Sequence, residues 1–345
     1  MRSFSRSAFL KLTGLAALGS SSALPSMFAT SGPRLIRPKR LREGATIALI
    51  APSSPPADEK ITKALSNLKT LGFQVVEGKS LRVRTGFLAG ADKDRLADLH
   101  DAFLDPAIDA VWCVRGGYGA GRLLPSLNYN LIKKHPKLLI GFSDITALHI
   151  AIHQRTGLIT MHGPVGASEF VPETLGHLKT MIMDGTSFHP IQAIPDNTQG
   201  AEFQPYTIHP GEAEGVLTGG NLTLLAALTG TPFTPVFKNK VVFLEDVGEQ
   251  PYRIDRMLTQ LLQGTDLKEA AGIALGVFFD CAPKPDSFSF SLRETLEMNL
   301  STLRMPVVYG MPFGHVTLNA TLPYGVRAKL DTTNQRLTLL EAAVE

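Results

Sequence analysis

The stretch "LLIGFSDITALHI", residues 138–150, carries the pattern of a strand, a tight turn and a helix in one short run. Residues 138–140 are an apolar run typical of a buried strand, and the apolar positions from 145 onward recur at helical spacing. Ser143 lies at the junction and has two interpretations. It is either a helix N-cap, with Asp144 favouring the helix dipole, or a nucleophile held at a strand-to-helix turn. Caps are the commoner use of such a serine, so these residues alone favour the cap.

The chain on both sides of this stretch alternates strand and helix patterns. Apolar strand patterns lie at residues 46–52, 73–76, 111–114, 138–140 and 158–161, and helical patterns lie at 61–71 and 96–103. Such alternation predicts a mostly parallel, doubly wound α/β sheet.

A proline-rich stretch, residues 166–210, interrupts this rhythm, and a short helix is expected within it near 175–183. A second alternating region follows and ends in the pattern of a terminal hairpin. The predicted organisation is a signal peptide, an N-terminal domain, a linker and a C-terminal domain, at residues 1–30, 44–165, 166–210 and 211–335.

The first thirty residues have the layout of an export signal. Three basic residues precede the short apolar stretch Leu12–Ala23, and small residues follow it. The stretch "SRSAFLK" is similar to a twin-arginine pattern, with Ser7 where the second arginine is expected. The apolar stretch is too short to span a bilayer comfortably. The sequence therefore predicts a periplasmic protein with no stable membrane span after processing.

Composition narrows the classes of partner and cofactor. The 345 residues carry a formal charge of +3, and the three basic residues of the leader account for all of it. The neutral remainder gives no reason to expect a nucleic-acid partner. Cys113 and Cys281 stand in or beside apolar runs, which predicts core thiols rather than a disulfide framework or a Cys-rich metal site.

Polar side chains follow several of the predicted strands. In doubly wound sheets ligands bind at the carboxyl ends of the strands. The candidates at such ends are Ser143, the glycine-rich run 115–122, Glu245 and His315. A carboxylate that closes an apolar strand is costly to bury alone, so Glu245 is expected to have a partner such as an imidazole, or else to end in solvent.

The glycine-rich run "RGGYGAGR", residues 115–122, fits neither the dinucleotide-binding spacing nor a Walker A motif. Its glycines suit a close backbone approach, with N–H groups near Gly117 directed at a developing oxyanion. An ordinary tight turn is the alternative.

A serine nucleophile needs a base. His149 and His153 lie on the helix that Ser143 opens, roughly 9 and 15 Å along its axis at 1.5 Å per residue. They are therefore expected to be packing or surface histidines. His162 and His315 each follow an apolar run, and the residues alone leave open which of them serves.

Several blocks of the sequence, in order, resemble one family. They are "TIALIAPSSP", "VRGGYGAGRLLPSL", "IGFSDITALH", "HGPV", "GVLTGGNLTLL", "FLEDVGEQPYRIDRML" and "GHVTLNATLPYGVRAKLD". Together they are similar to the LD-carboxypeptidase family of serine peptidases, which includes muropeptide tetrapeptidases and microcin C self-immunity peptidases. The resemblance covers about residues 44–331.

The resemblance implies a Ser-Glu-His triad. It makes Ser143 in "GFSD" the nucleophile, Glu245 in "FLED" the orienting acid and His315 in "FGH" the base. The implied oxyanion donors are backbone N–H groups near Gly117 and of Asp144, and no metal or other cofactor is required. The implied fold is a flavodoxin-like N-terminal domain and a smaller C-terminal α/β domain with the site in the cleft between them. Members are commonly dimers, which implies a homodimer.

The expected function is removal of a terminal D-amino acid, D-alanine, from a peptidoglycan tetrapeptide. One alternative within the family is a peptidase that detoxifies a peptide-nucleotide antibiotic. Another, of a different class, is a non-catalytic periplasmic muropeptide-binding protein. Two features depart from the family pattern: its recycling enzymes are usually cytoplasmic, and residues 166–210 match no family signature.

Overall fold

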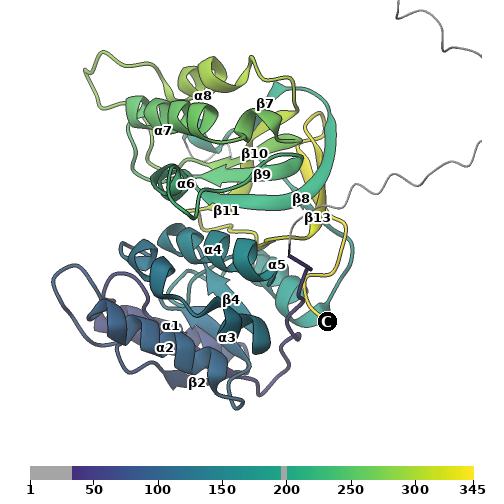
Figure 1. Cartoon of the computed structure of the whole chain (residues 1–345). Coiled ribbons are helices and arrows are strands. Elements are labelled where there is room, and N and C mark those ends of the chain that lie inside the picture. The colour runs from purple at the N-terminus through teal and green to yellow at the C-terminus, as the bar shows by residue number, and fades with distance from the viewer. Residues whose placement is uncertain (1–32, 196–199) are drawn as a thin grey trace, which may run out of the picture. The chain divides into compact units, whose positions relative to one another are not determined.

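The computed structural model describes residues 33–195 and 200–345, and the predicted signal peptide lies outside this part (Figure 1). Five parallel strands and one antiparallel strand form its first sheet. The strands are β1 (Thr46–Ile50), β2 (Gln74–Glu77), β3 (Ala110–Cys113), β4 (Leu138–Gly141), β5 (Met161–His162) and β12 (Leu322–Pro323). Their order is β12-β5-β4-β3-β1-β2. The parallel part has the 2-1-3-4-5 order of flavodoxin-like sheets, which confirms the predicted doubly wound fold.

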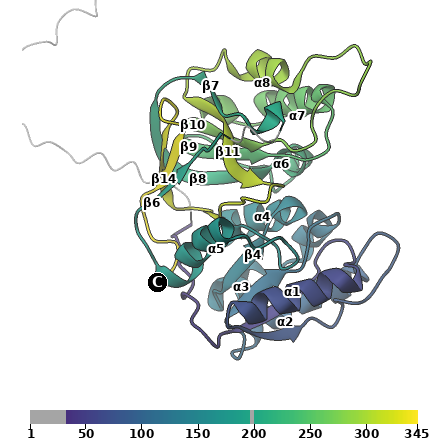
Figure 2. The same cartoon turned by 180° about the vertical axis from the view of Figure 1, so that it is seen from behind.

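Four helices cover this sheet: α1 (Asp58–Thr70), α2 (Asp92–Leu104), α3 (Tyr129–Lys134) and α4 (Thr146–Thr156). Helices α2, α3 and α4 contact one another in sequence along one face, and α1 lies on the other (Figures 1 and 2). The strand order reverses at β1, between β2 and β3. Loops that follow β1 and β3 therefore separate at this switch point, which is where doubly wound sheets bind ligands.

The second sheet has eight strands, in the order β6-β14-β13-β8-β9-β10-β11-β7. Four neighbouring strands are parallel: β8 (Glu212–Asn221), β9 (Lys240–Glu245), β10 (Gly272–Val277) and β11 (Val307–Gly314). The flanking strands are antiparallel: β6 (His189–Gln192), β7 (Tyr206–His209), β13 (Arg327–Asp331) and β14 (Arg336–Leu339). The β13–β14 pair confirms the predicted terminal hairpin.

Three helices follow strands of this second sheet: α6 (Leu222–Leu228), α7 (Pro251–Gly264) and α8 (Leu292–Leu300). Helix α7 packs between α6 and α8 (Figure 1). Its buried residues, Ile254, Leu258 and Leu261, recur at helical spacing and turn one apolar face to the core.

Residues 166–210 contain helix α5 (Pro172–Lys179) together with β6 and β7, two edge strands of the second sheet. Helix α5 is fastened to the loop that follows β11. The Thr174 hydroxyl donates to the Thr317 carbonyl at 2.8 Å and accepts from the Asn319 N–H at 3.0 Å. This stretch therefore braces the loop that begins at His315.

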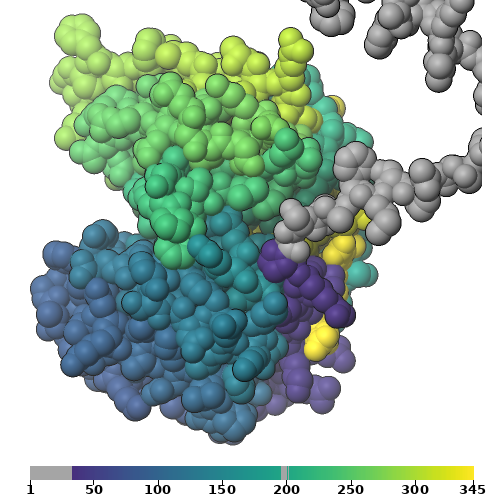
Figure 3. All heavy atoms as spheres, in the orientation of Figure 1, coloured from purple at the N-terminus to yellow at the C-terminus, as the bar shows by residue number. Residues whose placement is uncertain are grey.

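The start and end of residues 33–345 lie side by side (Figure 3). The Arg40 N–H donates to the Glu345 carbonyl at 3.0 Å, the Glu345 N–H donates to the Pro38 carbonyl at 3.1 Å, and Arg37 pairs with Glu341 at 2.8 Å. Residues 33–345 form one compact unit. Within its described part, no helix combines the length and apolar character needed to cross a membrane.

Both cysteines are buried free thiols, as predicted. Burial raises the pKa of the Cys113 thiol far above its ordinary value and that of Cys281 to about 12. Neither thiol is therefore a ready nucleophile at neutral pH.

Candidate active site

Ser143 is held in a strained backbone conformation at the turn that follows β4. Its φ is +64°, in the left-handed region that costs a non-glycine residue roughly 1–2 kcal/mol. The turn is tight because Gly141 lets Ile145 and the neighbouring strand approach; a Cβ on Gly141 would lie 3.0 Å from Ile145 and 3.2 Å from Cys113. Such strain in a single residue is typical of functional sites.

The helix-cap interpretation of Ser143 is wrong. The cap positions of the short turn 143–145 and of α4 are Phe142 and Ile145, and neither makes a side-chain cap hydrogen bond. The Ser143 side chain is half-buried, and its hydroxyl makes no hydrogen bond within the described chain. Ser143 therefore does not contribute a cap bond to α4.

Asp144 ties three loops of the first sheet together. Its Oδ2 accepts from the Ser53 hydroxyl at 2.5 Å, in the loop after β1, and from the Ala120 N–H at 2.8 Å, in the loop after β3. The side chain is almost fully buried, and burial raises its pKa, although these two hydrogen bonds act in the opposite direction. Ser53 was not singled out from the sequence. Its position after β1, at the switch point, was the available signal.

The glycine-rich loop lies directly against the serine. A Cβ on Gly116 would lie 2.9 Å from the Ser143 Cβ and 3.2 Å from the Asp144 nitrogen. Position 116 therefore admits only glycine unless the loop or the serine turn shifts. Gly117 has a φ of +120°, and a Cβ there would lie 2.5 Å from Ser54. The Ser54 hydroxyl also accepts from the Tyr118 N–H at 3.0 Å. The loop is thus held with its backbone beside Ser143, as the close-approach interpretation requires.

Glu245 and His315 meet at the carboxyl edge of the second sheet. Glu245 ends β9, and His315 directly follows the last residue of β11. Strand β10 pairs with both, and its Val277 lies opposite Gly314. The His315 Nδ1–H donates to the Glu245 Oε2 at 2.7 Å, with the carboxylate fully buried and the imidazole 20% exposed. Gly314 makes room for this pair, because a Cβ there would lie 2.9 Å from Oε2.

The two groups shift each other's pKa. Burial alone would raise the pKa of Glu245, but His315, with smaller contributions from His162 and Asn221, outweighs it and lowers that pKa. Burial alone would lower the pKa of His315, but the Glu245 carboxylate outweighs it and raises that pKa above its ordinary value. The carboxylate therefore stays ionised, and the imidazole is made more basic.

Asn221 and Asp246 support the Glu245 end of β9. Asn221 ends β8 opposite Glu245, and its amide donates to the Asp246 Oδ1 at 3.0 Å. Asp246 also accepts from the Thr223 N–H and hydroxyl, and burial followed by the Glu245 charge raises its pKa to about 6. Asn221 was missed from the sequence, although "GGN" ends a strand at the same edge.

Two contacts connect this edge with the serine turn. The Asn221 N–H donates to the Thr146 hydroxyl at 3.0 Å, in the first turn of α4. The ring of His315 packs on the ring of Phe142, the residue before Ser143, with centroids 4.8 Å apart. The structure therefore brings Ser143 and the Glu245–His315 pair together, although the Ser143 hydroxyl does not hydrogen-bond His315.

The other three candidate histidines lie in or against the core. His149 Nε2 bonds the Gly141 carbonyl at 2.8 Å, and His153 Nδ1 bonds the Leu158 carbonyl at 3.1 Å. Burial lowers their pKa values to about 3 and about 4. His162, the second candidate base, is fully buried at the end of β5. His315, by contrast, is partly exposed and already bonded to the carboxylate, which makes it the better placed base.

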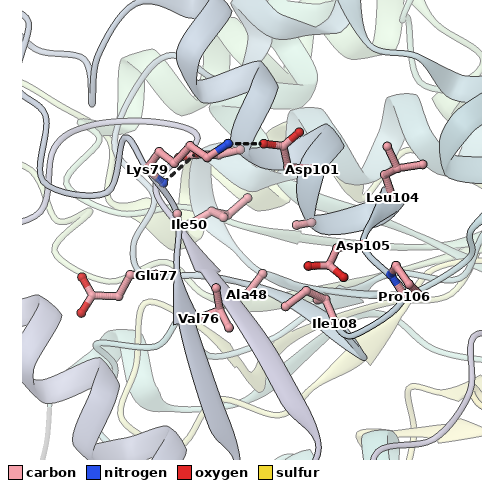
Figure 4. Close-up of a pocket in the computed structure, with 13 residues that line it drawn as sticks. Ala48, Ile50, Val76, Glu77, Lys79, Asp101, Leu104, Asp105, Pro106 and Ile108 are labelled. Atoms are coloured by element: carbon pink, nitrogen blue, oxygen red, sulfur yellow. Dashed lines mark hydrogen bonds and ion pairs between the residues drawn. The ribbon is translucent and has the colours of Figure 1, made fainter.

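A cavity of about 400 Å³ lies elsewhere, between the edge strand β2 and helix α2 (Figure 4). Its rim carries Lys79, paired with Asp101 at 2.8 Å, and its floor is apolar. None of the residues of the serine turn, the glycine-rich loop or the Glu245–His315 pair lines it.

The chain matches two family models. The LD-carboxypeptidase N-terminal domain matches residues 47–163, and the LD-carboxypeptidase C-terminal domain matches residues 214–330. The chain is 42% identical over 314 residues to a probable murein peptide carboxypeptidase of Bacillus subtilis, covering 89% of this chain and 95% of that protein. It is 36% identical over 298 residues to a murein tetrapeptide carboxypeptidase of Pseudomonas aeruginosa, covering 84% and 94%.

A solved structure is similar as well. The muramoyltetrapeptide carboxypeptidase of Oxalobacter formigenes superposes with a TM-score of 0.74 at 32% identity, covering 86% of this chain and 98% of that one. The first family match contains Ser143, and the second contains Glu245 and His315. The chain therefore belongs to the LD-carboxypeptidase family and is a peptidase of that family.

Proposed function

We propose that this chain is a serine peptidase that hydrolyses the L,D-peptide bond of peptidoglycan tetrapeptides and releases the terminal D-alanine. One observation carries the proposal: an imidazole bonded to a buried carboxylate packs on the residue before a strained serine. The names of the similar proteins, probable murein peptide carboxypeptidase and murein tetrapeptide carboxypeptidase, support the choice of substrate class.

The proposed reaction has two steps. In the first, the Ser143 oxygen forms a bond to the scissile carbonyl carbon while its proton passes to Nε2 of His315. The C–N bond then breaks, and His315 gives the proton to the departing amine of D-alanine. In the second, water attacks the resulting ester with His315 again as base, which releases the shortened peptide. Glu245 accepts from Nδ1–H throughout, so the tautomer with a free Nε2 is favoured.

The oxyanion of each tetrahedral intermediate needs donors beside Ser143. We assign this role to the backbone N–H groups of Gly117 and Asp144, since the glycine-rich loop approaches the serine most closely at Gly116. One preorganised donor of this kind is typically worth about 2.7–4 kcal/mol of transition-state stabilisation.

Arg115 is suited to the terminal carboxylate of the substrate. The site already holds three carboxylates, Glu245, Asp246 and Asp144, so an incoming carboxylate requires a cation nearby. The half-buried guanidinium of Arg115 bonds only carbonyl oxygens in the described chain, those of Gly116 and Pro55. It also lies 3.4 Å from the position of a Cβ on Gly117.

Mass spectrometry of products tests the function. The purified protein is incubated with murein tri-, tetra- and pentapeptides, and only the tetrapeptide is expected to lose D-alanine. A fluorophosphonate probe that labels the folded protein at Ser143 would separate an enzyme from a binding protein. Cleavage of a peptide-nucleotide amide with intact tetrapeptide would instead support the antibiotic-type alternative.

A matched pair of variants tests the role of Arg115. Arg115→Gln is expected to reduce the preference for a tetrapeptide over its C-terminal amide by about tenfold or more, with probe labelling intact. Arg122→Gln serves as the control, because Arg122 lies on the same loop but is already paired with Asp92 at 2.9 Å. Equal preference in Arg115→Gln and the wild type would remove Arg115 from substrate recognition.

We also propose that the protein is exported. The observation behind this is the basic and apolar pattern of residues 1–30, which lie outside the described residues. Cell fractionation with N-terminal sequencing of the mature protein is the test. A periplasmic product that begins between about residues 24 and 34 is expected. An intact Met1 on cytoplasmic protein would contradict it.

A further inference from the structure

His162 is a fully buried histidine whose two ring nitrogens have no hydrogen-bond partner in the described chain. A buried polar atom without a partner is unfavourable, so each such case calls for an explanation. His162 is the last residue of β5, and it pairs with Gly141 of the serine-bearing strand and with Leu322 of β12. Its position at the end of two paired strands leaves the backbone little freedom to relieve the mismatch.

The surroundings of His162 identify its neighbour. Its ring packs edge-on against Phe142, with centroids 5.8 Å apart, and against Phe243, with centroids 5.1 Å apart. The ring of Phe142 also packs against the ring of His315. Phe243 lies two positions before Glu245 on β9. Residues two apart on a strand project to the same face, so Glu245 points to the side on which His162 lies.

Glu245 has an unpartnered atom on the same side of the site. Its Oε2 accepts from His315, whereas its Oε1 is buried and accepts no hydrogen bond from the described residues. The Asn221 amide, which donates to Asp246, is close enough to lower the pKa of Glu245 as well. The charge of Glu245 raises the pKa of His162, and His162 in turn lowers the pKa of Glu245, as expected of close neighbours. The other titratable groups that act on His162 are His315 and His149.

We propose that His162, as a neutral imidazole, is a positioning residue for Glu245. It donates a ring N–H to Oε1, through a small rotation of the ring or one shared water molecule, and thereby keeps Oε2 on His315. Burial lowers the pKa of His162 to about 4, which is consistent with a neutral donor throughout the working range. The inference rests on the proposed role of Glu245 and His315 as acid and base.

Replacing His162 with phenylalanine removes the donor and keeps a ring between Phe142 and Phe243. The Glu245 charge is then concentrated on Oε2, which raises the pKa of His315, and the carboxylate itself becomes easier to protonate. Both effects act in the same direction on the pH profile of kcat/KM. They move its acid limb, the part where the rate falls as the pH drops, to higher pH.

We expect His162→Phe to lower kcat/KM about ten- to a hundred-fold, the range for one lost hydrogen bond to a charged group. The apparent pKa of the acid limb of the kcat/KM–pH profile should rise by about half a unit to one unit. Thermal stability should change little, because the hydrogen bond lost at Oε1 is offset by removing the second, unpaired ring nitrogen from the core. His162→Asn and His162→Gln place an amide donor near Nδ1 and Nε2, respectively, and at least one of them should restore most of the rate.

His153→Phe is the matched control, since His153 is a half-buried histidine that bonds the Leu158 carbonyl instead of the site. It should leave the acid limb in place. An NMR titration of the His315 ring gives a readout that does not depend on turnover, so the inference can be judged even where the proposed function fails. An unmoved His315 pKa and acid limb in His162→Phe would show that His162 only packs the core.

Discussion

The serine side and the acid–base side of the site are built in different ways. On the serine side, a strand, a left-handed residue and a helix follow one another within residues 138–156, so neighbours in the chain set the position of Ser143. On the other side, Glu245 and His315 stand 70 positions apart and meet because β10 pairs with both β9 and β11. The first depends on local backbone geometry and the second on strand register.

The two sides also differ in what holds them. Hydrogen bonds from Ser53 and Ala120 to Asp144 lock the serine turn to the loops after β1 and β3. The acid–base side is held by a hydrogen bond from His315 to the buried Glu245 carboxylate, and the two groups shift each other's pKa. Variants of the serine side should therefore change the rate with little effect on pH dependence, whereas variants of the other side should change both.

Ser143→Ala is expected to have the largest effect. The loss of the nucleophile should lower kcat/KM by about four orders of magnitude or more, measured on a murein tetrapeptide. Ser143→Gly should be as inactive but about 1 kcal/mol more stable to thermal unfolding, because glycine tolerates the left-handed conformation without strain. A Ser143→Ala enzyme with near-normal turnover would exclude the serine mechanism.

Glu245→Gln tests the opposite side. An amide no longer enforces the tautomer of His315 with a free Nε2, so a loss of about three to four orders of magnitude is expected, with probe labelling of Ser143 also slowed. The double variant Ser143→Ala/His315→Ala should be little worse than either single change, because triad members act as a unit. Additive losses in the double variant would mean that His315 binds substrate and does not act as the base.

Gly116→Ala tests the close approach of the loop to the serine. The new Cβ would meet the Ser143 Cβ at 2.9 Å, so the loop and the serine must separate. The expected loss in kcat is about a hundred-fold, comparable with removing one oxyanion donor. Gly121→Ala is the control on the same loop, since no atom lies within 4 Å of its Cβ, and it should keep the wild-type rate. Equal rates for the two variants would show that the loop is only a turn.

The pH dependence gives the smallest expected effect. Because His315 must be neutral to act as base and its pKa is raised, kcat/KM should fall as pH drops through a value above 6.5. The raised pKa also means that the ion pair contributes stability fully below the unfolded pKa, and that this contribution is lost as pH rises through the folded pKa. The wild type should therefore gain stability over His315→Gln on the acid side, measured by thermal unfolding across pH. An acid limb at or below the ordinary histidine pKa would contradict the pairing with Glu245.

The doubly wound class of the first sheet could be predicted from the sequence because each unit of the pattern is short. Apolar strands such as Leu138–Ile140, each followed by a helical pattern, allow few topologies other than a doubly wound sheet. The second sheet was predicted less fully. Strands β6 and β7 lie in the proline-rich stretch 166–210, where edge strands carry weak patterns that tertiary pairing stabilises.

The candidate residues of the site could be identified from the sequence, but the contacts between their side chains could not. Position after an apolar strand identified Ser143, Glu245 and His315 as candidates, and the family resemblance was needed to choose between His162 and His315. Asn221 and Ser53 were missed because a single asparagine or serine at a strand end has many ordinary uses.

The sequence by itself determined the strand–turn–helix that carries Ser143, the glycines beside it and the family to which the chain belongs. These features depend on local backbone preferences and on side-chain spacing within short segments, and both are written in consecutive residues. Only the tertiary structure decided that Ser143 is strained rather than a cap, that Asp144 ties three loops together, and that His315 bonds Glu245 while His162 is buried nearby. Such contacts depend on strand register and burial, which arise when segments distant in the chain pack against each other.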